Sequence, residues 1–162
     1  MNLYKQIFTQ LDRAGIDYII VGGVAVNLYG YSRFTGDIDI ILALNEKNIE
    51  ELDKLMHKLG YTERLPIHLK DLEDKKKLKG FMKEKGLKAF TFISSVKPQL
   101  DIDIIVEESL KFGEYEKRKK IIDVWDLKLP VCHIDDLIKM KKSAKREKDL
   151  LDLEALIKLK KI

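Results

Sequence analysis

The sequence has one cysteine and no long apolar run, and each scarcity excludes a class of protein. Cys132 alone cannot build a disulfide framework or a multi-cysteine zinc site. No stretch approaches the roughly 18 consecutive apolar residues that a membrane-spanning helix needs. The N-terminal residues also lack the apolar segment of a signal peptide. We therefore expect a soluble, cytoplasmic protein.

The remaining composition is that of a globular protein with many charges. The chain has 162 residues, of which 45% are apolar, so it can bury a core and is not disordered or fibrous. Charged residues make up 36%, above the usual share of about a quarter. The net charge of +4 permits a polyanionic partner without demanding one.

Lysine supplies all but five of the 31 basic residues, while asparagine and glutamine are scarce. This bias resembles that of proteins from heat-loving organisms, although an AT-rich genome would produce much of it. The lysines are dispersed along the sequence. A plain nucleic-acid-binding protein would gather them on one face, so the dispersion disfavours that class.

Alternating apolar patterns predict a mixed α/β (α+β) fold in which helices flank one sheet. We expect a single domain over residues 1–162, with a core of about 1–106 and a C-terminal hairpin and helices over about 107–162. Helices are predicted over 3–14, 24–30, 46–59, 70–85, 109–119, 134–143 and 146–160. Strands are predicted over 17–21, 37–44, 88–94, 100–106, 121–125 and 127–133.

The segment VGGVAVNLYGYSRFTGDIDI carries the strongest chemical signal. It begins with an apolar strand that ends at Gly22 and Gly23, where a short helix starts. Glycine lets the backbone approach a ligand closely because it has no Cβ. The start of a helix offers free N–H groups and partial positive charge, which suit phosphate. We therefore expect a phosphate site here, with Gly23 facing a cleft.

Asp37 and Asp39 follow on the next predicted strand. They are two residues apart, so both carboxylates project from the same face. Two carboxylates so close repel and tend to raise each other's pKa. A divalent cation relieves this repulsion, and oxygen ligands suit Mg²⁺ or Mn²⁺. A phosphate site beside a carboxylate metal site is the arrangement that phosphoryl or nucleotidyl transfer requires.

The same pattern occurs again at Asp101 and Asp103. Aspartate is depleted in strands, so a second Asp-x-Asp on a strand is hard to explain structurally. If the two strands are neighbours, three or four carboxylates converge on one patch. Asp101 also suits a solvent-facing position beside that patch.

These motifs resemble those of the DNA polymerase β-like nucleotidyltransferase superfamily. The resemblance rests on Gly-Gly, a short gap, Asp-x-Asp on a strand and a later strand aspartate. Within the superfamily the chain is similar to the small bacterial and archaeal branch that includes the abortive-infection toxin nucleotidyltransferases. The C-terminal segment DDLIKMKKSAKREKDLLDLEAL also resembles that branch.

The resemblance implies transfer of a nucleoside monophosphate from a Mg²⁺-bound NTP to a hydroxyl, and it implies ATP or another NTP as a partner. It assigns metal binding and catalysis to Asp37, Asp39 and Asp103, with Asp103 also helping to deprotonate the attacking hydroxyl. It assigns phosphate binding to Gly22, Gly23, Arg33, Thr35, Lys141 and Lys148. The acceptor stays open among RNA or tRNA, a protein and a small molecule. An antitoxin-like protein partner is also implied.

Other interpretations of the same residues remain open. The main alternative is an inactive nucleotide-binding or partner-binding module with the same fold. Lys141 and Lys148 also fit a solvated helix surface, and Asp149 and Asp152 fit ordinary helix ion pairs with Lys145 or Lys148. The three histidines show no spacing typical of a metal or catalytic set.

Two other enzyme classes are disfavoured. In dehalogenase-type phosphatases the Asp-x-Asp ends its strand, whereas here the apolar residues 40–42 continue it. A dinucleotide-binding fold is unsupported, because the glycines do not follow G-x-G-x-x-G.

Overall fold

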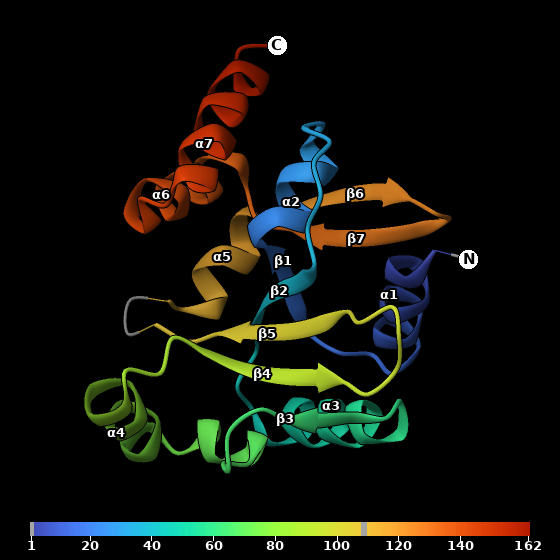
Figure 1. Ribbon diagram of the computed structural model, residues 1–162, viewed down its shortest axis with the longest axis vertical. Helices are drawn as coiled ribbons and strands as arrows, with labels where there is room; N and C mark the ends of the chain where they lie inside the picture. Colours follow the sequence, from blue (N-terminus) through green and yellow to red (C-terminus); the bar gives the residue numbers. More distant parts are fainter. Residues whose placement is uncertain (1, 108–109) are drawn as a thin grey trace.

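The computed structural model describes residues 2–107 and 110–162 as one seven-stranded sheet flanked by helices (Figure 1). The strands are β1 (Tyr18–Val21), β2 (Asp37–Leu42), β3 (Tyr61–Glu63), β4 (Ala89–Ser94), β5 (Asp101–Ile105), β6 (Lys120–Val124) and β7 (Leu127–Val131). The helices are α1 (Leu3–Arg13), α2 (Gly22–Tyr29), α3 (Glu46–Lys58), α4 (Lys75–Lys85), α5 (Phe112–Arg118), α6 (Ile134–Ala144) and α7 (Glu147–Lys160), with a 3-10 turn at Leu69–Glu73. The mixed α/β class predicted from the sequence is confirmed.

The sheet has the strand order β3-β4-β5-β2-β1-β7-β6. Strand β2 is central: it pairs antiparallel with β1 and parallel with β5. Strands β1 and β7 are also parallel, so the C-terminal β6–β7 hairpin extends the sheet beyond β1. Figure 1 shows α6 and α7 at one end of the molecule and α3 and α4 at the opposite end.

The core is formed by the apolar halves of these elements. All four residues of β1 are buried, as expected for a strand covered on both faces. Helix α1 contributes Phe8 and Leu11, and α3 contributes Leu52 and Met56, each with no exposed surface. These side chains lie at helical spacing, which is why one face of each helix packs on the sheet. None of the helices described is long and apolar enough to cross a membrane.

Most predicted elements are present, with three differences. The predicted helix 70–85 is divided, because Asp74 accepts hydrogen bonds from the N–H groups of residues 76 and 77 and so caps a new helix, α4. The short strand β3 was not predicted; it has only three residues and pairs at the sheet edge with β4. The helix predicted from Ser109 appears as α5, which begins at Phe112; positions 108–109 lie outside the described residues.

Candidate active site

The parallel pairing of β2 and β5 brings the predicted carboxylates together. Its register places Asp37 beside Asp101 and Asp39 beside Asp103. Because equivalent positions in neighbouring strands point to the same face, all four side chains share one side of the sheet. Asp37, Asp39 and Asp103 each offer a carboxylate oxygen, and these three atoms lie within 4.8 Å of one another.

This crowding perturbs the pKa values of the two β2 carboxyl groups. Burial raises the pKa of Asp39 to about 7, and the neighbouring Asp37 and Asp103 add to the shift. Burial also raises the pKa of Asp37, again with a contribution from Asp103. Protein groups alone therefore do not balance the charge of the cluster. Three converging oxygen ligands with uncompensated negative charge fit a hard divalent cation such as Mg²⁺ or Mn²⁺.

The other two strand aspartates differ in their partners. Thr91 lies opposite Asp103 on β4, and its hydroxyl donates a hydrogen bond of 2.5 Å to Asp103 Oδ1. This bond orients the Asp103 carboxylate, which is also part of the cluster. Asp101 instead accepts hydrogen bonds from the Ser94 N–H at 3.0 Å and from Gln99 Nε2 at 2.9 Å. Asp101 is therefore held by structural partners.

Gly22 lies where β1 meets α2, directly against the carboxylate cluster. Its φ of +66° falls in the region that favours glycine, and a Cβ there would lie 2.0 Å from Asp39 Oδ2. A side chain at position 22 would therefore displace Asp39. The N-cap of α2 is Val21, which supplies no side-chain hydrogen bond, and the first turn has no acidic residue. Within the described chain, the start of α2 thus keeps its N–H groups free of such a cap beside the cluster.

The surroundings of Gly23 differ from what we expected. Gly23 is buried, and a Cβ there would lie 2.7 Å from Thr35 Oγ1 and 2.9 Å from Arg33 Nη2. The prediction that this position faces a cleft is therefore wrong. Gly23 instead allows the loop before β2 to pack on α2. Thr35 is held from the other side, where the Tyr4 hydroxyl donates to its carbonyl oxygen.

Arg33 is joined to the C-terminal helices by a buried ion pair. Its Nε and Nη2 atoms donate to the two oxygens of Asp152 on α7, at 2.6 and 2.7 Å. Lys141 Nζ of α6 lies 2.8 Å from the same carboxylate. Burial alone would raise the pKa of Asp152, but the hydrogen bonds from Arg33 and Lys141 hold it below its usual value.

A second buried carboxylate extends this network. Asp149 of α7 accepts hydrogen bonds from Lys141 Nζ at 3.1 Å and Arg146 Nε at 2.7 Å. Burial opposes ionisation of Asp149, but Arg146 and Lys141 together hold its pKa below the usual value. Three cations therefore serve two buried carboxylates, which leaves one positive charge in excess. The observed partners differ from Lys145 and Lys148, which we had considered from the sequence.

The remaining predicted cation, Lys148, is exposed at the start of α7. Its charge is near enough to lower the pKa of Asp37, against the larger effect of burial. The structure therefore gathers Gly22, the three carboxylates and Lys148 near one another. Arg33 and Lys141 belong instead to the ion-pair network with Asp149 and Asp152.

A cleft of about 380 Å³ adjoins this centre. Gly22 and Asp39 form part of its wall, together with Lys141 and Arg146. Its apolar lining comes from four separate parts of the chain, namely β1, β5, α5 and α6. The apolar lining residues are Val21, Ile105, Tyr115, Leu137, Met140 and Ala144. The carboxylate cluster thus opens into a cleft with both apolar and cationic walls.

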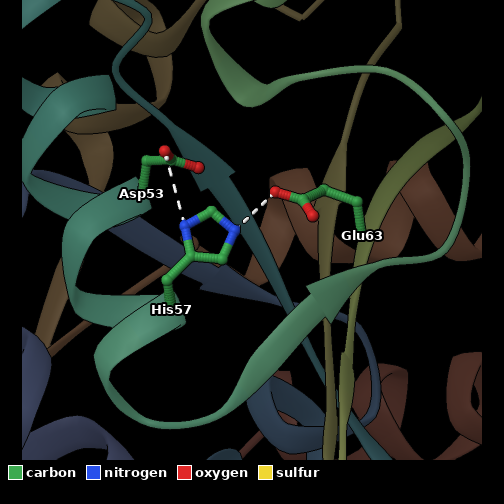
Figure 2. Close-up of side chains that lie close together, drawn as sticks. All are labelled: Asp53, His57 and Glu63. Carbon is green, nitrogen blue, oxygen red and sulfur yellow. Dashed lines mark hydrogen bonds and ion pairs between the residues drawn. The ribbon is translucent and has the colours of Figure 1, made fainter.

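A histidine cluster lies elsewhere, between α3 and β3. Figure 2 shows Asp53 and Glu63 on opposite sides of the His57 ring. Glu63 Oε1 lies 2.6 Å from Nε2, and Asp53 Oδ2 lies 3.5 Å from Nδ1. An ion bound to one ring nitrogen would face one carboxylate and leave the other behind the ring. We therefore interpret the cluster as an ion-paired link between α3 and the sheet edge.

Sequence reasoning missed two residues of the site. Thr91 was hidden because threonine is common in strands, and only the β4–β5 register shows that it faces Asp103. Arg146 was treated only as part of the C-terminal motif. Its role as a partner of Asp149 depends on the capping geometry at the start of α7, which the residue spacing alone does not specify.

Solved structures with the same fold are nucleotidyltransferases. The lincosamide antibiotic adenylyltransferase LnuA, bound to lincomycin, is 15% identical with a TM-score of 0.62, and the match covers 98% of each chain. ANT(2″)-Ia in complex with adenylyl-2″-tobramycin is also 15% identical with a TM-score of 0.58, covering 95% of this chain and 85% of that one. No curated protein sequence matches the chain.

A family model gives the assignment that such distant structures cannot give. The model described as "Nucleotidyl transferase AbiEii toxin, Type IV TA system" matches residues 9–162. The match includes the glycine turn, both Asp-x-Asp strands and the C-terminal helices. It agrees with the resemblance drawn from the motifs. The chain therefore belongs to the AbiEii family of nucleotidyltransferase toxins from type IV toxin–antitoxin systems.

Proposed function

We propose that this protein transfers a nucleoside monophosphate from an NTP to a hydroxyl group of an acceptor and releases pyrophosphate. The observation that carries the proposal is the convergence of Asp37, Asp39 and Asp103 beside the start of α2. In the reaction, the acceptor oxygen forms a bond to the α-phosphorus. The bond from that phosphorus to the bridging oxygen of the β-phosphate breaks, and pyrophosphate leaves with its electron pair.

Asp103 is the best-placed group to accept the proton of the attacking hydroxyl. The hydrogen bond from Thr91 occupies one of its oxygens and fixes its orientation. The Asp103 carboxylate also belongs to the cluster, with an oxygen within 4.8 Å of oxygens of Asp37 and Asp39. A general base must be held in position before the reaction, and Thr91 provides this.

Asp37, Asp39 and Asp103 would hold the divalent cation, Mg²⁺ or Mn²⁺. When bound, such an ion stabilises negative charge on the attacking and leaving oxygens. The crowded carboxylates fit this role because the pKa values of Asp37 and Asp39 show uncompensated negative charge. Binding a cation would keep both groups ionised at neutral pH.

The triphosphate would lie against the start of α2. Free N–H groups at a helix start favour phosphate. Gly22 brings the backbone next to Asp39, so a phosphate bound at the start of α2 would lie beside the cation held by the carboxylates. Lys148 would add positive charge from the open side, and the excess charge of the network around Arg33 and Lys141 would add to it.

The nucleoside would occupy the adjoining cleft. Tyr115, Leu137 and Met140 give it an apolar lining that suits a base. Lys141 and Arg146 lie on the same walls, where they would meet phosphate or ribose oxygens. The toxin role of the family would then follow from modifying an acceptor that the cell needs, under the control of an antitoxin.

The direct test is incubation with α-labelled NTPs, Mg²⁺, total RNA and cell extract. We expect label on RNA or protein with the wild-type chain and none with Asp103→Asn. Thr91→Val should slow transfer by releasing Asp103 from its fixed orientation, and it should preserve NTP binding because it removes no metal ligand. Binding of NTP without any transfer of label would instead support an inactive nucleotide-binding module.

A further inference from the structure

Lysines occur along the whole sequence, as noted above, but the net positive charge is concentrated in one segment. Residues 70–88 contain eight lysines and four acidic residues, which gives +4. The whole chain also carries +4, so the rest of the molecule is neutral. The lysine-rich composition alone does not explain this, because the numbers of basic and acidic residues are equal in the rest of the chain.

Helix α4 carries most of this segment and places three of its six lysines in a row along one face. Lys75, Lys79 and Lys83 are spaced at i, i+4 and i+8, so they form a stripe along the helix, and all three are exposed. Like charges at this spacing repel and weaken a helix. A helix selected only for stability would alternate lysine with glutamate. Helix α4 also buries no residue completely, so packing does not explain the stripe.

Three of the four acidic residues of the segment precede the stripe, and the fourth, Glu84, lies near the end of α4. Asp74 caps α4, and Asp71 accepts from the His68 N–H and pairs with Lys77 at 3.4 Å. Glu73 lines a different cavity, beside α3. The acidic side chains thus gather mainly at the start of the segment, and the stripe keeps its charge.

The stripe borders a groove that leads to the carboxylate cluster. Lys79, Lys83 and Lys88 line a groove of about 590 Å³ together with Met82, Val106 and Glu107. Glu107 also lines the cleft beside Asp39, so the groove and the cleft adjoin. Glu107 lies four residues after Asp103, which is at most about 14 Å of extended chain. A strand of phosphates on the lysines could therefore continue into the active site.

We propose that the groove between α4 and the end of β5 binds the phosphodiester backbone of a nucleic-acid acceptor and directs it toward Asp103. This rests on the proposed function, since it names the acceptor of that transfer. Evenly spaced lysines suit regularly spaced phosphates and read no base sequence. An acidic protein partner would require a broad complementary surface, whereas the lysines here line one groove that adjoins the cleft beside Asp39.

The test is fluorescence anisotropy with labelled single-stranded RNA and DNA of the same sequence. The test variant carries Lys79→Gln, Lys83→Gln and Lys88→Gln together. The matched control carries Lys47→Gln, Lys54→Gln and Lys58→Gln on α3, which removes the same charge from exposed lysines away from the groove. Mg²⁺-dependent ATP binding serves as a check of folding, and all three proteins should retain it.

We expect the wild-type protein and the control variant to bind with similar affinity. The α4 variant should bind at least about tenfold more weakly, and its salt slope should fall by roughly two, because three phosphate contacts are lost. Such a loss with either nucleic acid supports the proposal. Failure of wild-type binding, or equal binding by the α4 variant and the control, would overturn it. Equally strong binding of a polyglutamate peptide at the same lysines would overturn it in favour of an acidic protein.

Asp39→Asn separates this proposal from the proposed function. It should lose Mg²⁺-dependent ATP binding yet bind nucleic acid as the wild type does. If Asp39→Asn retains ATP binding, the metal assignment fails while the groove result stands. If the α4 variant alone binds nucleic acid normally, the groove proposal fails while the transfer chemistry stands.

Discussion

Two glycines with the same positive φ show how the site constrains a single residue. Gly15 and Gly22 both have a φ of +66°. Around Gly15 an added Cβ would meet nothing within 4 Å among the described residues, whereas at Gly22 it would meet the Asp39 carboxylate. A positive φ therefore strains alanine at both positions, and at Gly22 the contact with Asp39 is added.

We predict that Gly15→Ala lowers the free energy of unfolding by about 1–2 kcal/mol, the cost of a left-handed alanine. Gly22→Ala should lower it further and abolish Mg²⁺-dependent ATP binding, because Asp39 must move. Urea denaturation and calorimetric titration of both variants measure this. Equal effects of the two substitutions would mean that Gly22 serves only the turn.

The raised pKa of Asp39 makes a prediction about pH. Its value is 3.8 in the unfolded reference and about 7 in the metal-free fold, so the folded protein holds the proton more tightly between these values. The stabilisation by the protonated group is therefore present below the unfolded value and is lost as pH rises toward the folded one.

In EDTA, the wild-type protein should lose stability relative to Asp39→Asn as pH rises from about 5 to about 8. The wild type should lose on the order of 2–4 kcal/mol of unfolding free energy relative to Asp39→Asn across this pH range, given the size of the pKa shift of Asp39 and the coupling within the cluster. Mg²⁺ should reduce it by neutralising the carboxylates. Thermal melts across this range provide the measurement, and parallel pH profiles of the two proteins would contradict the assignment.

At the level of elements, the loop before β2 is tied to α6 and α7 by buried charges. Asp152 has no exposed side-chain surface, and it contacts both Arg33 and Lys141. Removing a partner from such a pair leaves buried charge uncompensated. The lowered pKa of Asp152 also means that its stabilisation is present above its unfolded value near 3.8 and is lost as pH falls further.

Asp152→Ala should therefore lower the free energy of unfolding by about 3–5 kcal/mol at neutral pH. Glu154→Gln is the matched control on the same helix. It breaks an exposed pair with Lys158 and should change stability by less than about 0.5 kcal/mol. Urea denaturation of both variants provides the comparison. Similar small effects would show that the network is not a structural tie.

The sequence predicts elements with a regular pattern better than it predicts their contacts. The spacing of apolar residues predicts helix α3 and strand β2, and the structure contains both. The three-residue β3 has too little pattern to detect, and only pairing with β4 stabilises it. Asp37 and Asp39 could be singled out because aspartate is unusual in a strand. The side-chain partners of Arg33 and Asp101 depend on tertiary placement, which spacing does not specify.

For the whole molecule, the fold brings together three components of the candidate site: carboxylates, the start of a helix and cations. Strands β2 and β5 supply the carboxylates, α2 supplies the start of a helix, and α6 and α7 supply the cations. The segment with the net positive charge, α4 and its flanks, lies at the opposite end of the molecule from α6 and α7 (Figure 1), and its groove adjoins the cleft beside Asp39. This separation suits an enzyme that holds the nucleotide at one place and guides a second substrate from another.

The most direct test of the account is calorimetric titration with a non-hydrolysable ATP analogue, in Mg²⁺ and in EDTA. The wild-type protein, Asp39→Asn and Asp101→Asn should be compared, since Asp101 shares the face of the sheet but is held by Ser94 and Gln99. We predict Mg²⁺-dependent binding by the wild type and by Asp101→Asn, and loss of most of that binding in Asp39→Asn. Binding by Asp39→Asn at wild-type affinity would contradict the assignment of the carboxylate cluster as the metal site.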